Sequence, residues 1–260
     1  MMTTMGFQET KQPMGADRTI PETNTVEVID LSITLNDQLY PCKVIINEAA
    51  ERGGPAILFL HGYGECGTDN EKQLTVGLPK HAAENPEKWP YVLIVPQKPI
   101  FNTEWQDHEE AILKLLQDAD QQGLYDPDRL GITGLSQGGH GTIILAAKYP
   151  ELFQAAAPVC GYTERRISKD QERLEENGAS PTDPEVMQAA EGLSNIPTWF
   201  VHGDKDSVVP VSESRSLFGA LKELDANTRY TELADVDHNS WDHAYTDRDL
   251  IDWFKEHLGE

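Results

Sequence analysis

The sequence has few cysteines and lacks both a long apolar run and an apolar N-terminal segment. Cysteine occurs three times, as Cys42, Cys66 and Cys160, without C-x-x-C spacing. This number and spacing argue against a disulfide framework and a structural zinc site, and they favour buried free thiols. No apolar run approaches the roughly 18 residues of a membrane span. The N-terminal stretch MMTTMGFQETKQPMG lacks the apolar segment of a signal peptide, so we expect a cytoplasmic protein that does not bind membranes.

Basic residues are also few. The chain has 21 Lys and Arg against 44 Asp and Glu, which gives a formal net charge of −23. Such a field repels nucleic-acid phosphates and anionic lipid surfaces, which argues against both as partners. A solvated acidic surface, suited to a salty medium, explains the excess of acid, and a cationic substrate is the alternative.

The length and composition suit one large domain. The 260 residues are 38% hydrophobic, enough to form a substantial core. Residues 1–24 are polar with scattered proline and glycine, and we expect them to be disordered. We therefore predict a single folded domain over residues 25–260.

Within this domain, apolar runs of strand length alternate with segments of helical period. The sequence predicts strands over 25–35, 38–46, 55–62, 91–97, 129–133, 153–161, 197–204 and 228–234. It predicts helices over 71–84, 103–123, 141–150, 212–224 and 247–258. This alternation predicts an α/β fold with a mostly parallel central sheet and helices on both faces. In such sheets, active sites form at the carboxyl ends of the strands.

Ser136 lies where a predicted strand turns into a predicted helix. With Gly134 and Gly138 it completes the pattern G-x-S-x-G, and Gly139 follows. The pattern is typical of a nucleophile elbow, a strained turn that exposes the serine hydroxyl. A glycine-rich loop that happens to contain serine is the alternative.

A serine nucleophile needs a base, and the base needs a carboxylate to orient it. Asp204 and Asp206 both follow the predicted strand 197–204, and His238 follows the strand after it. The chain order Ser, Asp, His is that of the α/β-hydrolase scaffold. The sequence therefore predicts an acyl-transfer site at the strand ends.

Five segments resemble the serine esterase branch of the α/β-hydrolases: LFLHGYGECGTDN, GLSQGGHGT, AAPVCG, HGDKDSVVP and DHNSW. This branch includes phospholipase/carboxylesterase-type enzymes, dienelactone-hydrolase-like enzymes and prolyl-oligopeptidase-like predicted peptidases. The resemblance covers residues 55–258 and implies a single-domain α/β-hydrolase fold. Dienelactone hydrolases carry a cysteine nucleophile, so Ser136 favours the serine esterases.

The resemblance also implies roles for individual residues. It places the acid at Asp206, the second acidic position of HGDKDSVVP, and leaves Asp204 as a turn former. It places the base at His238 in HNSW. One oxyanion donor is the backbone N–H of Gln137, the residue after the nucleophile, and the resemblance places the second at Tyr63.

The remaining candidates have structural interpretations. We expect His61 to hold the Tyr63 loop, His140 to pack or hydrogen-bond, and His243 and His257 to lie at the surface. An acidic loop could suggest a metal site, but the resemblance favours hydrogen bonds to its backbone; its residues are Glu65, Asp69 and Asn70. We predict no metal and no cofactor.

Two tryptophans, Trp105 and Trp241, are candidates for lining the substrate pocket. Relatives often place a tryptophan at the position of Trp105, and Trp241 lies three residues after His238. Since tryptophan is most often a core residue, core packing is the alternative for both.

The predicted function is that of a serine carboxylesterase, which hydrolyses small carboxylic esters through an acyl-enzyme intermediate. A peptidase or amidase of prolyl-oligopeptidase type is the nearest alternative, and the sequence shows no propeller or other gating domain. A non-catalytic binding protein of the same fold would be expected to lack a triad residue. The natural ester and the oligomeric state stay open.

Residues 162–195 form an insertion between two predicted core strands, longer than relatives usually carry. KDQERLEEN and DPEVMQAAEGL can each form a short helix, the second with Asp183 and Pro184 at its start. We expect either a small cap over the serine, where Arg165 and Arg166 could meet an anionic group, or a solvated surface excursion.

Overall fold

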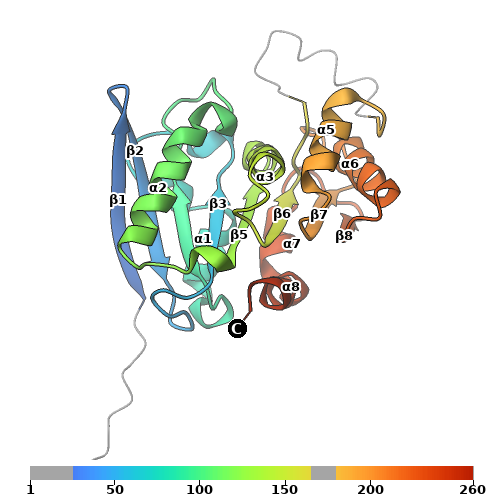
Figure 1. Ribbon diagram of the computed structural model, residues 1–260. Coiled ribbons are helices and arrows are strands. Elements are labelled where there is room, and N and C mark those ends of the chain that lie inside the picture. Colours follow the sequence, from blue (N-terminus) through green and yellow to red (C-terminus); the bar gives the residue numbers. More distant parts are fainter. Residues whose placement is uncertain (1–25, 165–179, 260) are drawn as a thin grey trace, which may run out of the picture.

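One eight-stranded sheet organises the computed structural model, which describes residues 26–164 and 180–259 (Figure 1). The strands lie in the order β1-β2-β4-β3-β5-β6-β7-β8. Their bounds are β1 Glu27–Leu35, β2 Gln38–Ile46, β3 Ala56–Leu60, β4 Val92–Pro96, β5 Leu130–Leu135, β6 Ala155–Val159, β7 Thr198–Gly203 and β8 Thr228–Leu233. The predicted strands are confirmed, with ends that differ by a few residues.

The first two strands form an antiparallel hairpin. Asn36 and Asp37 join them with φ values of 49° and 62°, a left-handed backbone that these two residue types tolerate. β2 also pairs antiparallel with β4, whereas the pairs from β4 through β3, β5, β6 and β7 to β8 are parallel. Five of these six parallel strands are buried along their whole length, because helices cover both of their faces.

Helices cover both faces of the sheet, as predicted. One layer comprises α2 (Glu109–Gln121), α3 (Gln137–Lys148), α5 (Pro184–Leu193) and α6 (Ser212–Glu223). The other comprises α1 (Gly77–Glu84), α7 (Trp241–Thr246) and α8 (Arg248–Leu258). Short 3-10 turns precede or join these helices: Tyr63–Glu65, Lys72–Leu74, Pro86–Lys88, Trp105–His108 and Pro127–Arg129.

Successive side chains of each strand enter opposite cores. In β3, Leu58 and Leu60 point toward the α2 and α3 layer, and Ile57 and Phe59 point toward the α1, α7 and α8 layer. The amphipathic helix α8 adds Trp253 and other apolar residues to the second core. The sheet is thereby fixed from both sides, and its carboxyl edge is held in place.

The described part of the insertion belongs to the helical layer. Helix α5 begins at Pro184 after Asp183, as predicted, but the Asp183 carboxylate accepts a hydrogen bond from Ser180 N and does not cap the helix. Val186 and Leu193 are buried in the core shared with α3 and α6. The predicted helix KDQERLEEN and both arginines lie outside the described residues, as does the segment 1–24, so the cap stays a prediction for that part of the insertion.

Among residues 26–164 and 180–259, no helix combines the length and the apolarity that crossing a bilayer requires.

Candidate active site

Ser136 lies between the end of β5 and the start of α3, in a backbone conformation that few non-glycine residues adopt. Its φ and ψ are 54° and −115°. Such geometry costs free energy and persists only where the surrounding structure enforces it. Here Ser136 N donates to the carbonyl of Val159 in the neighbouring strand at 2.9 Å. The strained turn of a nucleophile elbow is therefore present at the serine.

The glycines beside Ser136 are required by close backbone approach. A Cβ on Gly138 would lie 1.9 Å from the carbonyl oxygen of Leu60, and one on Gly134 would lie 2.5 Å from that of Gly138. Helix α3 thus packs directly against the ends of β3 and β5. The G-x-S-x-G pattern follows from this contact, since any side chain at either glycine would separate the backbones.

His238 and Asp206 complete a hydrogen-bonded chain with Ser136. Nε2 of His238 lies 3.0 Å from Oγ of Ser136, and Nδ1 lies 2.8 Å from Oδ2 of Asp206. Since a carboxylate only accepts, Nδ1 carries a proton and Nε2 is the nitrogen that can take one from the serine. The Asp206 side chain is fully buried and that of His238 is 18% exposed. The structure therefore brings together the three residues that the sequence predicted.

Four donors converge on the Asp206 carboxylate. Oδ1 accepts from the backbone N–H groups of Val208 and Val209 at 2.9 and 2.8 Å. Oδ2 accepts from His238 and also lies 3.1 Å from Nε2 of His202. Burial alone would raise the pKa of Asp206, but these donors outweigh it and hold the pKa below its ordinary value. The carboxylate is thus kept ionised and fixed in orientation.

His202 is the contact that sequence reasoning missed. It is fully buried in β7, with Nε2 3.0 Å from the carbonyl of Val209 and Nδ1 2.7 Å from Oγ of Ser214. Because Nε2 faces two acceptors, it carries the proton and can donate to Asp206. The signal was available in HGDKD, where the histidine precedes Asp206 by four residues.

The loops that carry the acid and the base are tied together by a second aspartate. Oδ1 of Asp237 accepts from N and Oγ of Ser207 and from N of His238, at 2.7–2.8 Å. Asp204 instead lies at the end of β7, where its N–H donates to the carbonyl of Leu233. The geometry thus distinguishes the two candidate acids, and it selects Asp206.

Both predicted oxyanion donors lie beside the elbow. Gln137 is the first residue of α3, and its side-chain Nε2 donates to the carbonyl of Thr103 at 3.0 Å. Tyr63 opens the turn after β3. Its neighbour Gly62 lies so close to Leu135 that a Cβ there would come within 2.9 Å of that side chain. Their role as donors stays a prediction.

The family model that matches this chain is the prolyl oligopeptidase family, over residues 102–260. These residues include Ser136, Asp206 and His238. The chain belongs to the prolyl oligopeptidase family.

Named relatives of this family member include esterases. A thermostable esterase of known crystal structure is 27% identical, with a TM-score of 0.71, and the match covers 88% of this chain and 62% of that one. Esterase LipQ of Mycobacterium tuberculosis is 32% identical over 149 residues, covering 47% of this chain and 35% of that protein. The putative esterase YitV of Bacillus subtilis is 23% identical over 245 residues, covering 83% of this chain and 94% of that protein.

These comparisons confirm the resemblance to α/β-hydrolases of the serine esterase type. The chain spans about a third of the length of LipQ and less than two thirds of that of the thermostable esterase.

In this prolyl oligopeptidase family member, Trp105 lies beneath the site instead of lining a pocket. It is 1% exposed, and its indole N–H donates to the carbonyl of His61 at 3.0 Å. The prediction of pocket lining is wrong for Trp105, because the ring packs in the core against His61 and Gly141. Trp241 is half-buried and meets the His238 ring edge-on at 5.4 Å, so it supports the base, and its contact with substrate stays a prediction.

The remaining histidines have the structural positions that were expected. His61 accepts from N of Lys98 and donates to the carbonyl of Gly62, which holds the Tyr63 loop. Burial lowers the pKa of His61 to about 3, so the ring is neutral. His140 stacks on the ring of Tyr162. His243 is exposed and His257 is partly exposed.

Of the acidic loop residues, Asp69 hydrogen-bonds to the backbone of its own loop, as the resemblance implied. The side-chain amide of Asn70 instead donates to Asp30 and to the carbonyl of Cys42, outside the loop. Oδ1 of Asp69 accepts from the N–H groups of Glu71 and Lys72, which lower the pKa of Asp69 to about 2. Within the described ranges, the set of ligand-type atoms close enough to share a metal belongs to Cys160, Asp206 and His238, all within 4.8 Å. His238 and Asp206 already hydrogen-bond to each other, an arrangement that suits proton transfer.

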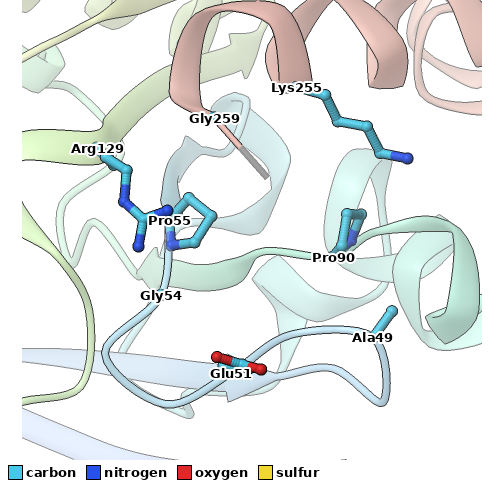
Figure 2. A pocket seen from close by; sticks show the side chains of 8 residues that line it. All are labelled: Ala49, Glu51, Gly54, Pro55, Pro90, Arg129, Lys255 and Gly259. Carbon is cyan, nitrogen blue, oxygen red and sulfur yellow. The ribbon is translucent and has the colours of Figure 1, made fainter.

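A separate hollow lies at the amino ends of the parallel strands, away from their carboxyl ends (Figure 2). Pro55, Pro90 and Arg129 line it and directly precede or adjoin the amino ends of β3, β4 and β5. Ser136 follows the carboxyl end of β5, so this hollow is no part of the candidate active site.

Proposed function

We propose that this chain is a serine carboxylesterase that hydrolyses small carboxylic esters through an acyl-enzyme intermediate. The observation that carries the proposal is the unbroken hydrogen-bonded chain from Asp206 through His238 to Ser136, with the serine on a strained elbow. Neither the strain nor the buried carboxylate has a purpose in a binding protein of the same fold, which favours catalysis.

In the acylation step, Oγ of Ser136 attacks the ester carbonyl while Nε2 of His238 takes its proton. The N–H groups of Gln137 and Tyr63 hold the oxyanion of the tetrahedral intermediate. When the intermediate collapses, His238 gives the proton to the departing alcohol and the acyl group remains on Ser136. Water, deprotonated by His238, then releases the acid and regenerates the serine.

Asp206 acts on the base and not on the substrate. Its Oδ2 accepts the Nδ1 proton of His238, which leaves Nε2 free to accept from Ser136. When the imidazole becomes a cation, the ionised carboxylate stabilises it. The His202 contact keeps Asp206 in place during both steps.

Peptide hydrolysis on the same residues is the second candidate, and the prolyl oligopeptidase family match favours it. The esterase names of LipQ, YitV and the thermostable structure favour esters. An amide requires protonation of a poorer leaving group, so an ester is also the less demanding substrate for the same triad. Cytoplasmic location and the absence of nucleic-acid partners stay predictions from the sequence.

The test compares p-nitrophenyl acetate and butyrate with peptide p-nitroanilides, using wild type and Ser136→Ala. We expect kcat/KM to be larger for the esters, and Ser136→Ala to lower kcat by roughly 10⁴ or more. A larger kcat/KM for the anilides would assign the chain to the peptidases, and ester turnover that survives Ser136→Ala would refute the proposed nucleophile.

A further inference from the structure

Exposed apolar side chains gather beside the candidate active site. Among the described residues, nine large apolar side chains are strongly exposed. Tyr63 and Val208 belong to loops that carry an oxyanion donor or a triad residue, and Ile100 and Phe101 belong to the loop after β4, whose Thr103 carbonyl accepts a hydrogen bond from Gln137. We call these four the apolar rim: Tyr63 at 51%, Ile100 at 42%, Phe101 at 41% and Val208 at 58%. Scattered exposure is normal at protein surfaces, but concentration around one site is not.

The rim lies next to the residues that act in the proposed reaction. Tyr63 is itself one of the two proposed oxyanion donors, and its ring meets that of Phe101 edge-on, with centroids 5.4 Å apart. The loop that carries Phe101 joins the elbow, because the side chain of Gln137 donates to the carbonyl of Thr103. Val208 lies beyond the acid, and its N–H donates to Asp206.

The framework that exposes the rim is buried and fixed. Lys98 is fully buried, and its Nζ donates to the carbonyls of Ile100 and Thr103 at 2.8 and 2.7 Å. Trp105, also buried, fixes the other end of the loop through His61. The apolar side chains are therefore held in solvent, which is unfavourable unless a ligand covers them.

We propose that the apolar rim binds an apolar, preferentially aromatic, group attached to the scissile carbonyl. The proposal rests on the proposed function and adds the class of substrate. The edge-on pair of Tyr63 and Phe101 leaves ring surface exposed, and an aromatic group packs well against such surface. An apolar acyl group also suits a protein with a formal charge of −23, since it brings no additional negative charge.

The experiment measures kcat/KM for p-nitrophenyl 4-phenylbutyrate and p-nitrophenyl acetate. In wild type we expect the larger ester to be preferred, and in Phe101→Ser we expect the ratio of the two values to fall about tenfold. Phe101→Leu should restore part of the ratio. Leu224→Ser is the matched control, because Leu224 is also 41% exposed but ends α6 at the opposite edge of the sheet, and it should leave the ratio unchanged.

Two outcomes would refute the proposal that the apolar rim binds an apolar group of the substrate. One is a wild type without preference for the larger ester, and the other is a Phe101→Ser ratio equal to that of wild type at unchanged thermal stability. Either would leave the esterase proposal standing. If neither esters nor anilides are hydrolysed, the proposed function fails, and calorimetry on Ser136→Ala then tests whether the apolar rim binds the ester. Adding Phe101→Ser to that variant should raise the Kd of the phenylbutyrate ester about tenfold. An equal Kd in the two variants, or no binding to Ser136→Ala, contradicts the proposal.

Discussion

The most discriminating perturbation is a pair of isosteric substitutions, Asp206→Asn and Asp204→Asn. Both remove one negative charge from the same loop, but the two carboxylates have different surroundings. Asp206 accepts from two backbone N–H groups on Oδ1 and from His238 and His202 on Oδ2. Buried Oδ1 of Asp204 accepts no hydrogen bond from the described parts of the chain.

In Asp206→Asn, the amide oxygen can still accept the two backbone N–H groups, so the NH₂ group faces His238. A donor at that position favours the ring tautomer with its proton on Nε2, which cannot take the proton of Ser136. We expect kcat to fall about 10³- to 10⁴-fold, which corresponds to about 4–5.5 kcal/mol of lost transition-state stabilisation. Asp204→Asn removes no contact to the triad, and we expect kcat within about threefold of wild type.

The assay is the initial rate on p-nitrophenyl butyrate, with thermal unfolding to verify that both variants fold. Equal losses in the two variants, or a larger loss in Asp204→Asn, would refute the assignment of the acid. A small loss in a well-folded Asp206→Asn would refute the role given to its charge.

Three further predictions follow from named contacts. The lowered pKa of Asp206 keeps its carboxylate ionised, so this group should add no limb to the pH profile of kcat between pH 5 and 8, and a limb in that range that disappears in Asp206→Asn would contradict this. His202→Phe removes a buried donor to Asp206 and should lower the free energy of unfolding by about 2 kcal/mol or more, measured in urea, and an unchanged midpoint would exclude that role. Gly138→Ala places a Cβ against the Leu60 carbonyl and should lower the free energy of unfolding by about 3 kcal/mol or more. A wild-type Tm would instead show that the backbones of α3 and β3 can separate enough to admit the Cβ.

Local sequence signals were sufficient for the fold and the triad. Strands covered on both faces read as continuous apolar runs, and the elbow needs glycine wherever backbones touch, so Gly134 and Gly138 marked Ser136. The Ser, Asp, His order then limited the acid and the base to a few residues. The choice of Asp206 over Asp204 came from the resemblance, and the geometry agrees with it.

The errors concern features that depend on tertiary packing. A tryptophan near a site gives the same sequence pattern whether its ring faces the substrate or the core. Only the packing against His61 decides that Trp105 is buried. The contact of His202 with Asp206 arises because β7 ends in a tight turn that brings residues four apart together. Helix α7, with six residues, is too short to show a period.

The most direct test of the account is covalent labelling with a fluorophosphonate ester, followed by intact-mass spectrometry and peptide mapping. We expect one adduct per chain, located on Ser136, formed slowly in Asp206→Asn and absent from Ser136→Ala. An unlabelled wild type, or an adduct on any other residue that persists in Ser136→Ala, would contradict the claim that Ser136 is an activated nucleophile.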